Sequence, residues 1–157
     1  FNIITPYERS EYDDIGFSHV FSDFIKNIIY EKKNPLPIIG DGYQVRCFTW
    51  IDDVAQGIVD LSFGETTRNE IFNLSNPEPL NMRDLATMIH RKAVEKGLVE
   101  NRQLGFETVM DFPNDVVVRI PSGARAKELL GWETNHKVEQ SIDKCIDHII
   151  SEKIYDR

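Results

Sequence analysis

Two arginines stand out as residues that could bind an anion. Arg46 lies in PLPIIGDGYQVRCFTWIDD, residues 35–53, between a Gly-Asp-Gly turn and an apolar run, and Arg119 follows three valines. A guanidinium is permanently charged, and its planar set of N–H donors matches phosphate or carboxylate oxygens. We therefore interpret both arginines as candidate ligands of an anionic group.

Each arginine also has a structural alternative. Arg46 could be exposed at a strand end or pair with Asp41, and Arg119 could pair with Asp115 or Asp53. An ion pair would satisfy a guanidinium without any ligand. The residues alone favour binding but leave both alternatives open.

Three further residues, Asp52, Asp53 and His19, have side chains that could bind a ligand but that also have simple structural roles. Asp52 and Asp53 could suggest a metal ligand or an acid pair, but adjacent residues at a strand end point to opposite sides. Capping of the following helix is therefore the preferred role for these aspartates. His19 could be a ligand, a capping residue or a surface histidine.

Composition and charge restrict the class of protein. The chain has 157 residues, the size of one domain, and its net charge of −8 argues against general binding to nucleic acid or to an anionic membrane surface. We find no apolar run long enough to span a membrane, and no signal peptide at the start. Cys47 and Cys145 lie in apolar sequence, so we expect reduced, buried thiols and a cytoplasmic protein.

The hydrophobic pattern predicts a mixed α/β domain. Extended pieces that lie far apart in the sequence alternate with amphipathic segments, so we expect a small mixed sheet and several helices. The pattern predicts helices over 18–32, 54–64, 81–96, 122–131 and 138–150, and extended segments over 36–39, 45–51, 70–74, 104–108 and 116–119. Asn81 is the expected cap of the third helix.

Five segments, in this order, resemble the C-terminal half of the extended short-chain dehydrogenase/reductase family, the branch that remodels nucleotide sugars. FNIITP is similar to FNVYGP, and FSHVFSDFIKNI to HVIPxFI. NPLPIIGDGYQVRCFTWIDDVAQGI is similar to xPLxIYGDGxQxRxFxYVDDxxxGI. NLS followed by NMRDLA resembles NLGxxxxxSxxELA, and NDVVVRIPSGARAKELLGWET resembles DDPxxRxPDxSKAKxLLGWxP. The resemblance covers nearly the whole chain, to about residue 150.

The resemblance implies a fold and a set of binding residues. Residues 1–157 would form the nucleotide-sugar-binding lobe of a Rossmann-type enzyme without its NAD-binding lobe, and residues 1–17 would connect the two. The implied roles are diphosphate binding by the two arginines and the start of the first helix, base recognition by the backbone of one strand, and a sugar or phosphate contact at the lobe boundary. The residues that match these positions are Arg46, Arg119, His19, Val20, Pro37, Ile38, Ile39 and Asn2.

The chain departs from the family pattern at two places. Pro37 has no N–H, so one backbone donor toward a base is missing and the identity of the pyrimidine stays open. Ser122 replaces the usual Asp, and Arg125 stands where Lys is common. These changes weaken the expected helix start and leave Arg119 in place.

The family's catalytic features are absent from this sequence. There is no glycine-rich dinucleotide fingerprint and no tyrosine followed four residues later by lysine. The resemblance therefore implies a parent enzyme that is an NAD-dependent nucleotide-sugar epimerase or dehydratase, with no catalytic or metal-binding residue in this chain. These residues alone are expected to be inactive.

The resemblance also implies a ligand and an assembly. We expect a UDP-sugar in preference to a dTDP-, CDP- or GDP-sugar, and a homodimer of the full-length protein. The alternatives are a non-catalytic binding module of the same fold and an oxidoreductase of the superfamily that acts on a non-nucleotide substrate. The sequence does not choose between epimerisation, dehydration and decarboxylation.

Overall fold

The computed structural model describes residues 2–6, 19–63, 65–111 and 114–152. Its helices are α1 (Val20–Ile25), continued by a π-helical turn (Lys26–Tyr30), α2 (Ile51–Ser62), α3 (Met82–Glu95), α4 (Ala124–Leu130) and α5 (Val138–Ser151), with a 3₁₀ turn at Glu65–Thr67. Its strands are β1 (Ile3–Ile4), β2 (Leu36–Ile39), β3 (Val45–Cys47), β4 (Thr49–Trp50), β5 (Pro79–Asn81) and β6 (Phe106–Met110).

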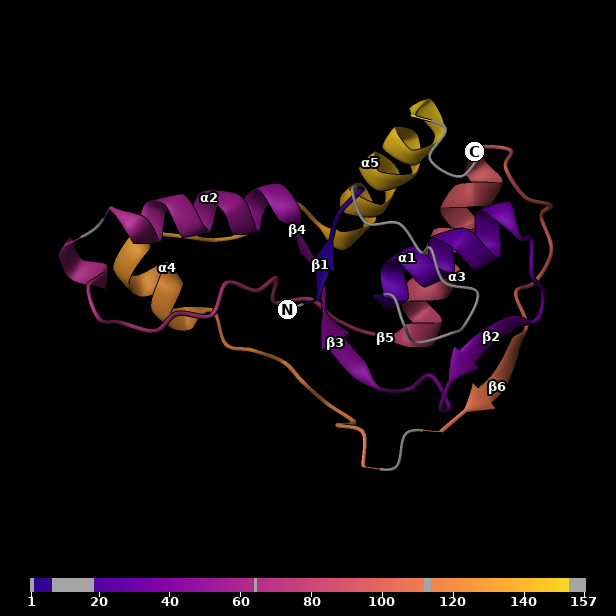
Figure 1. Cartoon of the computed structure of the whole chain (residues 1–157), viewed down its shortest axis with the longest axis horizontal. Coiled ribbons are helices and arrows are strands. Elements are labelled where there is room, and N and C mark those ends of the chain that lie inside the picture. The colour runs from indigo at the N-terminus through magenta and orange to yellow at the C-terminus, as the bar shows by residue number, and fades with distance from the viewer. Residues whose placement is uncertain (1, 7–18, 64, 112–113, 153–157) are drawn as a thin grey trace.

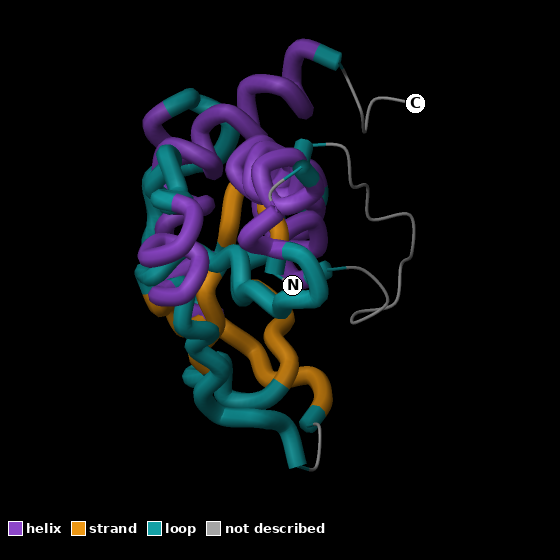
Figure 2. Tube along the Cα trace, turned by 90° about the vertical axis from the view of Figure 1, so that its left-hand side faces the viewer, coloured by secondary structure: helices purple, strands orange, loops and turns teal. Residues whose placement is uncertain are grey.

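The strands form three two-stranded sheets. β1 pairs with β4 and β2 with β6, both in parallel, whereas β3 and β5 are antiparallel. This arrangement confirms the predicted mixed α/β class, although the single small sheet is divided into three. Figure 2 shows the strands running beside and below the helices.

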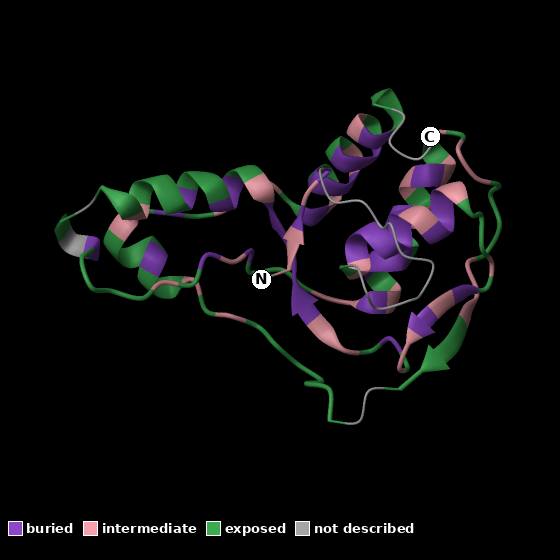
Figure 3. Cartoon of the chain, in the orientation of Figure 1, coloured by how far each residue is buried: buried purple, intermediate pink, exposed green. Residues whose placement is uncertain are grey.

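The main core lies where α1, α3 and α5 surround β1 and β4 (Figure 1). The apolar faces of these helices point inward and are the buried surfaces in Figure 3. Fully buried members of this core are Ile4, Ile25, Leu85, Ile89, Ile142 and Ile146. Asn81 caps α3, as predicted, because its side chain accepts a hydrogen bond from the backbone N–H of Asp84 at 2.8 Å.

A second, smaller core joins α2 to α4, at the left of Figure 1. Leu74, Ala126 and Trp132 are its buried members. Gly57 in α2 is required here, because a Cβ at this position would lie 2.6 Å from Trp132 Nε1 and 2.7 Å from Leu74 Cδ1. This core fixes the path of the chain on either side of α4.

Three sequence predictions are wrong in detail. Residues 70–74 form no strand, because the Ile71 carbonyl and the Asn73 side chain bond to the chain around α4 instead of to a neighbouring strand. The extended run 45–51 is divided at Phe48, since β3 and β4 pair with different strands. Asp52 and Asp53 do not cap α2, which starts at Ile51.

The three apolar valines before Arg119 are exposed. Val116, Val117 and Val118 are 45%, 67% and 55% exposed. An isolated parallel bridge between Val45 and Val118 and the ion pair of Asp115 with Arg46 tie this segment to β3. Residues 114–119 therefore run along the edge of β3 without forming a strand of a sheet.

Charged side chains connect α3 to α5. Lys92 lies 3.0 Å from Glu139 and 2.9 Å from Asp143, and Arg91 lies 3.0 Å from Glu139. Hydrogen bonds that Lys92 donates to Asp143 and then to Glu139 raise the pKa of Lys92. Hydrogen bonds that Glu139 accepts from Lys92 and then from Arg91 lower the pKa of Glu139. The network therefore stabilises the helix pair while these carboxylates are ionised.

Replacing Lys92 by methionine is expected to lower the melting temperature by about 2 to 4 °C near neutral pH. The lowered pKa of Glu139 means that its contribution is complete above its ordinary value of 4.5 and is lost as pH falls through the folded-state pKa. Thermal melts should therefore show the two proteins converging at acid pH. Lys127→Met, which removes an exposed pair with Glu133, is the control and should change little at any pH.

Both cysteines are buried and unpaired, as predicted. In the described part of the chain, no helix combines the length and the apolar character needed to cross a membrane.

Candidate functional site

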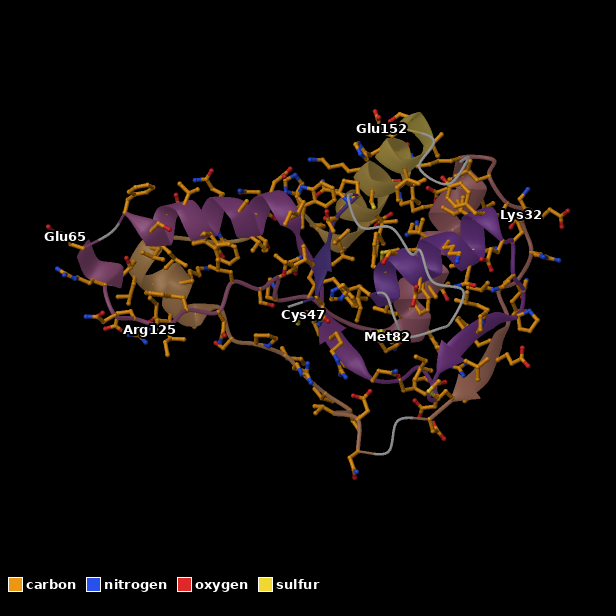
Figure 4. All side chains as sticks on the ribbon, viewed as in Figure 1. Lys32, Cys47, Glu65, Met82, Arg125 and Glu152 are labelled. Carbon is orange, nitrogen blue, oxygen red and sulfur yellow. The ribbon has the colours of Figure 1, made fainter. Side chains whose placement is uncertain are left out.

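A pocket of about 310 Å³ lies between the start of α1, β2 and β3. Except for Arg119, every binding residue expected from the sequence lines it: Asn2, His19, Val20, Pro37, Ile38, Ile39 and Arg46. Asp23, Phe24, Asn27, Gln44, Met82 and Asp115 complete the lining. Met82, at the start of α3 and labelled in Figure 4, is a buried member of this lining. The structure thus brings together residues from five parts of the sequence.

The Gly40–Gly42 turn positions β2 and β3 around the pocket. Gly42 has a φ of +78°, and a Cβ there would lie 2.5 Å from Ile38 Cδ1, so this position requires glycine. Asp41 stabilises the turn, because its Oδ1 accepts a hydrogen bond from the N–H of Tyr43 at 2.9 Å. Asp41 is therefore a turn residue and not the partner of Arg46 that the sequence suggested.

Arg46 is nearly buried, with its side chain 10% exposed. Its Nη1 donates to the carbonyl of Val45 at 2.8 Å, and its Nη2 donates to Asp115 Oδ1 at 3.0 Å. A guanidinium has five N–H donors, so these two bonds leave donors for another acceptor. Arg46 thus combines a fixed position at the pocket with the capacity to bind an anion.

Arg119 lies in a neighbouring pocket of about 240 Å³, together with Asn2, Cys47 and Ser75. The side chain is exposed, and no carboxylate among the described residues forms an ion pair with it. The alternatives suggested by the sequence are therefore not found: Asp115 pairs with Arg46, and Asp53 with His136. Asn2 lines both pockets and connects the two arginines.

Two residues of this pocket, Asp115 and Gln44, are not predicted from the sequence as site residues. Gln44 precedes Arg46 by two positions, so alternation in extended backbone could have placed both side chains on one face. Its Nε2 donates to the Ile39 carbonyl at 3.1 Å. The sequence suggests Asp115 only as a partner of Arg119. No local signal connects it to Arg46, which lies 69 residues earlier.

The described residues contain no evident catalytic group in these pockets. Burial raises the pKa of the Cys47 thiol, and the weaker opposing effect is a hydrogen bond from Ser75, so Cys47 is a poor nucleophile at neutral pH. No group of three or more metal-binding side chains occurs in the part of the chain that the structure describes. The arrangement is suited to binding an anionic ligand.

Neither of the two direct strand-to-helix junctions among the described residues has the form of a dinucleotide-binding turn. A dinucleotide needs a glycine-rich turn between a strand and a helix, so that the backbone can approach the pyrophosphate. Here β4 runs directly into α2 at Trp50–Ile51, and β5 runs directly into α3 at Asn81–Met82. Neither junction leaves room for such a turn.

The fold is a small α/β lobe, and its pocket gathers the side chain of Arg46 with residues of α1, β2 and β3. A sequence model of the GDP-mannose 4,6-dehydratase family matches residues 1–145. The chain belongs to this family, which is part of the nucleotide-sugar epimerases and dehydratases of the extended short-chain dehydrogenase/reductase type.

Curated relatives include sugar-nucleotide enzymes from plants and bacteria. UDP-glucuronic acid decarboxylase 4 of Arabidopsis thaliana is 33% identical over 128 residues, which are 82% of this chain and 26% of the relative. UDP-glucuronate 4-epimerase of Thermodesulfobacterium geofontis is 31% identical over 120 residues, which are 76% of this chain and 34% of the relative. The chain therefore spans about a quarter to a third of these proteins.

Solved structures show the same fold. The UDP-glucuronic acid 4-epimerase of Bacillus cereus, in complex with UDP-glucuronic acid and NAD, has a TM-score of 0.78 and 22% identity, over 99% of this chain and 44% of that one. The dTDP-glucose 4,6-dehydratase of Streptomyces venezuelae has a TM-score of 0.78 and 19% identity, over 98% and 43%. In both cases this chain corresponds to less than half of the neighbour.

Proposed function

We propose that this chain supplies the nucleotide-sugar-binding part of an NAD-dependent epimerase, dehydratase or decarboxylase, and that its ligand is a UDP-sugar. The observation that carries the proposal is the single pocket that gathers Arg46, Asn2, His19 and the strand Pro37–Ile39. The relatives named for UDP-glucuronic acid support a UDP-sugar as the ligand.

Each part of the ligand has a proposed partner. Arg46 binds a phosphate through the N–H groups that are not used by Val45 and Asp115. Arg119 reaches the diphosphate from the neighbouring pocket, and Asn2 contacts the ligand where the two pockets adjoin. The backbone of Pro37–Ile39 lies along the base, with the carbonyl of Pro37 available but no N–H.

The proposed mechanism assigns binding and orientation to this chain. NAD, when bound in the parent enzyme, supplies hydride transfer at the sugar. The dinucleotide site and the catalytic tyrosine and lysine are not among these 157 residues, so we propose that they are supplied by sequence outside them. By fixing the diphosphate, Arg46 and Arg119 orient the sugar toward that site. We also propose that the full-length enzyme is a cytoplasmic homodimer and that these residues alone are inactive.

Calorimetric titration of the protein with UDP, uridine and NAD tests this proposal. UDP should bind, uridine should bind much more weakly because it lacks the phosphates, and NAD should not bind. Equal affinity for UDP and uridine would contradict the role given to the arginines. Tight binding of NAD would contradict the division of roles between this chain and the rest of the enzyme.

A further inference from the structure

The carboxylate that neutralises Arg46 in this structure lies at the wall of the same pocket. Asp115 Oδ1 accepts from Arg46 Nη2 at 3.0 Å, and both residues line the pocket. A nearly buried guanidinium is costly without a counter-charge. Asp115, whose side chain is 40% exposed, provides that charge while no ligand is bound.

Asp115 is held in place by few contacts. Residues 114–119 attach to β3 through backbone bonds of Val45, whose N–H donates to the Val117 carbonyl at 2.7 Å and whose carbonyl accepts from the Arg119 N–H at 3.0 Å. The valines of the segment are largely exposed and bury little apolar surface. Segments with so few buried contacts are displaced at small cost in free energy.

We propose that Asp115 is an internal substitute for the ligand phosphate, which displaces it from Arg46 on binding. This inference rests on the proposed function of the pocket. The phosphate and the Asp115 carboxylate compete for the same Nη2 donor, because both are oxygen acceptors suited to a guanidinium. Asp115 therefore lowers the affinity of the site for phosphate-bearing ligands and makes binding selective for a group that can replace a carboxylate.

Hydrogen bonds to the carbonyl of Val45 connect Arg46 to Arg119. The Val45 carbonyl accepts from Arg46 Nη1 at 2.8 Å and from the Arg119 N–H at 3.0 Å, so the bonds of both arginines meet at one atom. Asp115 and Arg119 lie four residues apart in the same segment, which is attached to β3 at Val45. Release of Asp115 from Arg46 therefore moves the segment that carries Arg119.

The test is calorimetric titration of UDP into the protein and into Asp115→Asn, which keeps the size of the side chain and removes its charge. Asp115→Asn should bind UDP about three- to fivefold more tightly, the size expected for releasing a half-exposed ion pair. Asp111→Asn is the matched control: it removes the same charge from the same loop, and Asp111 has no ion pair with Arg46. The control should change UDP affinity much less.

The outcomes separate this inference from the proposed function. Tighter binding by Asp115→Asn, with backbone amide shifts at residues 117–119 of the wild-type protein on addition of UDP, supports the inference. Weaker or unchanged binding by Asp115→Asn, with UDP still bound by the wild type, overturns the inference alone and assigns Asp115 to positioning or to structure. Absence of UDP binding in both proteins overturns the proposed function as well.

Discussion

Asp53→Ala is expected to lower the free energy of unfolding by about 3 kcal/mol, because it removes a buried carboxylate from a bonded network. Asp53 is 3% exposed, and its two oxygens bind His136, one at the backbone N–H at 3.1 Å and the other at Nδ1 at 2.9 Å. These bonds attach the first turn of α2 to the chain that leads into α5. Their loss leaves the backbone N–H and the Nδ1 of the partly buried His136 without this carboxylate.

Asp52→Ala is the matched control, since it removes the adjacent carboxylate at an exposed position. Asp52 accepts one hydrogen bond, from Trp50 Nε1 at 2.8 Å, and its loss should cost much less. Chemical denaturation of both variants measures the difference. Equal destabilisation by the two substitutions would contradict a special role for the buried pair of Asp53 and His136.

Arg46→Ala is expected to weaken UDP binding by about 2 to 3 kcal/mol, the size of a charge-assisted phosphate contact. One alternative from the sequence is a side chain exposed at a strand end, whose loss would leave stability nearly unchanged. The structure shows Arg46 nearly buried and bonded to Val45 and Asp115, so we also expect a loss of about 1 kcal/mol in the free energy of unfolding. Calorimetric titration and denaturation of the same sample separate the two effects.

Arg46→Lys is the control that separates the effect of the positive charge from the effect of the guanidinium geometry. An ammonium keeps the charge but lacks the planar set of donors, so this variant should recover part of the affinity only. Combining Arg46→Ala with Asp115→Asn extends the test: without the competing carboxylate, loss of Arg46 should cost more affinity than it does in the wild-type background. Unchanged UDP affinity with a lowered melting temperature would assign Arg46 a purely structural role.

Local patterns in the sequence predicted most of the fold. The amphipathic helices, the Asn81 cap and the Gly40–Gly42 turn depend on residues close in sequence, and the structure contains all of them. The resemblance to a family named Asn2, His19 and Arg46 as one site, and these residues line one pocket. The predictions of helices, cap and turn succeed because periodicity, capping and turn chemistry act over a few residues.

The errors concern contacts between distant residues. The sequence predicts Asp53 as a helix cap because helix starts favour aspartate. In the structure its partner is His136, which lies 83 residues later. The sequence predicts a strand over residues 70–74, although α4 and not another strand lies beside them. The partner of Arg46 could not be chosen among several aspartates, because an ion pair depends on which loops the fold brings together.

A crystal structure of the protein with UDP tests the central claim most directly. We expect the diphosphate within hydrogen-bond distance of the Arg46 guanidinium and the base along Pro37–Ile39. A separate pocket of about 390 Å³, lined by Lys32, Lys33 and Arg102, offers an alternative position for an anion. UDP in the pocket of Arg46 would support the account, whereas UDP bound only beside Lys32 and Arg102 would contradict it.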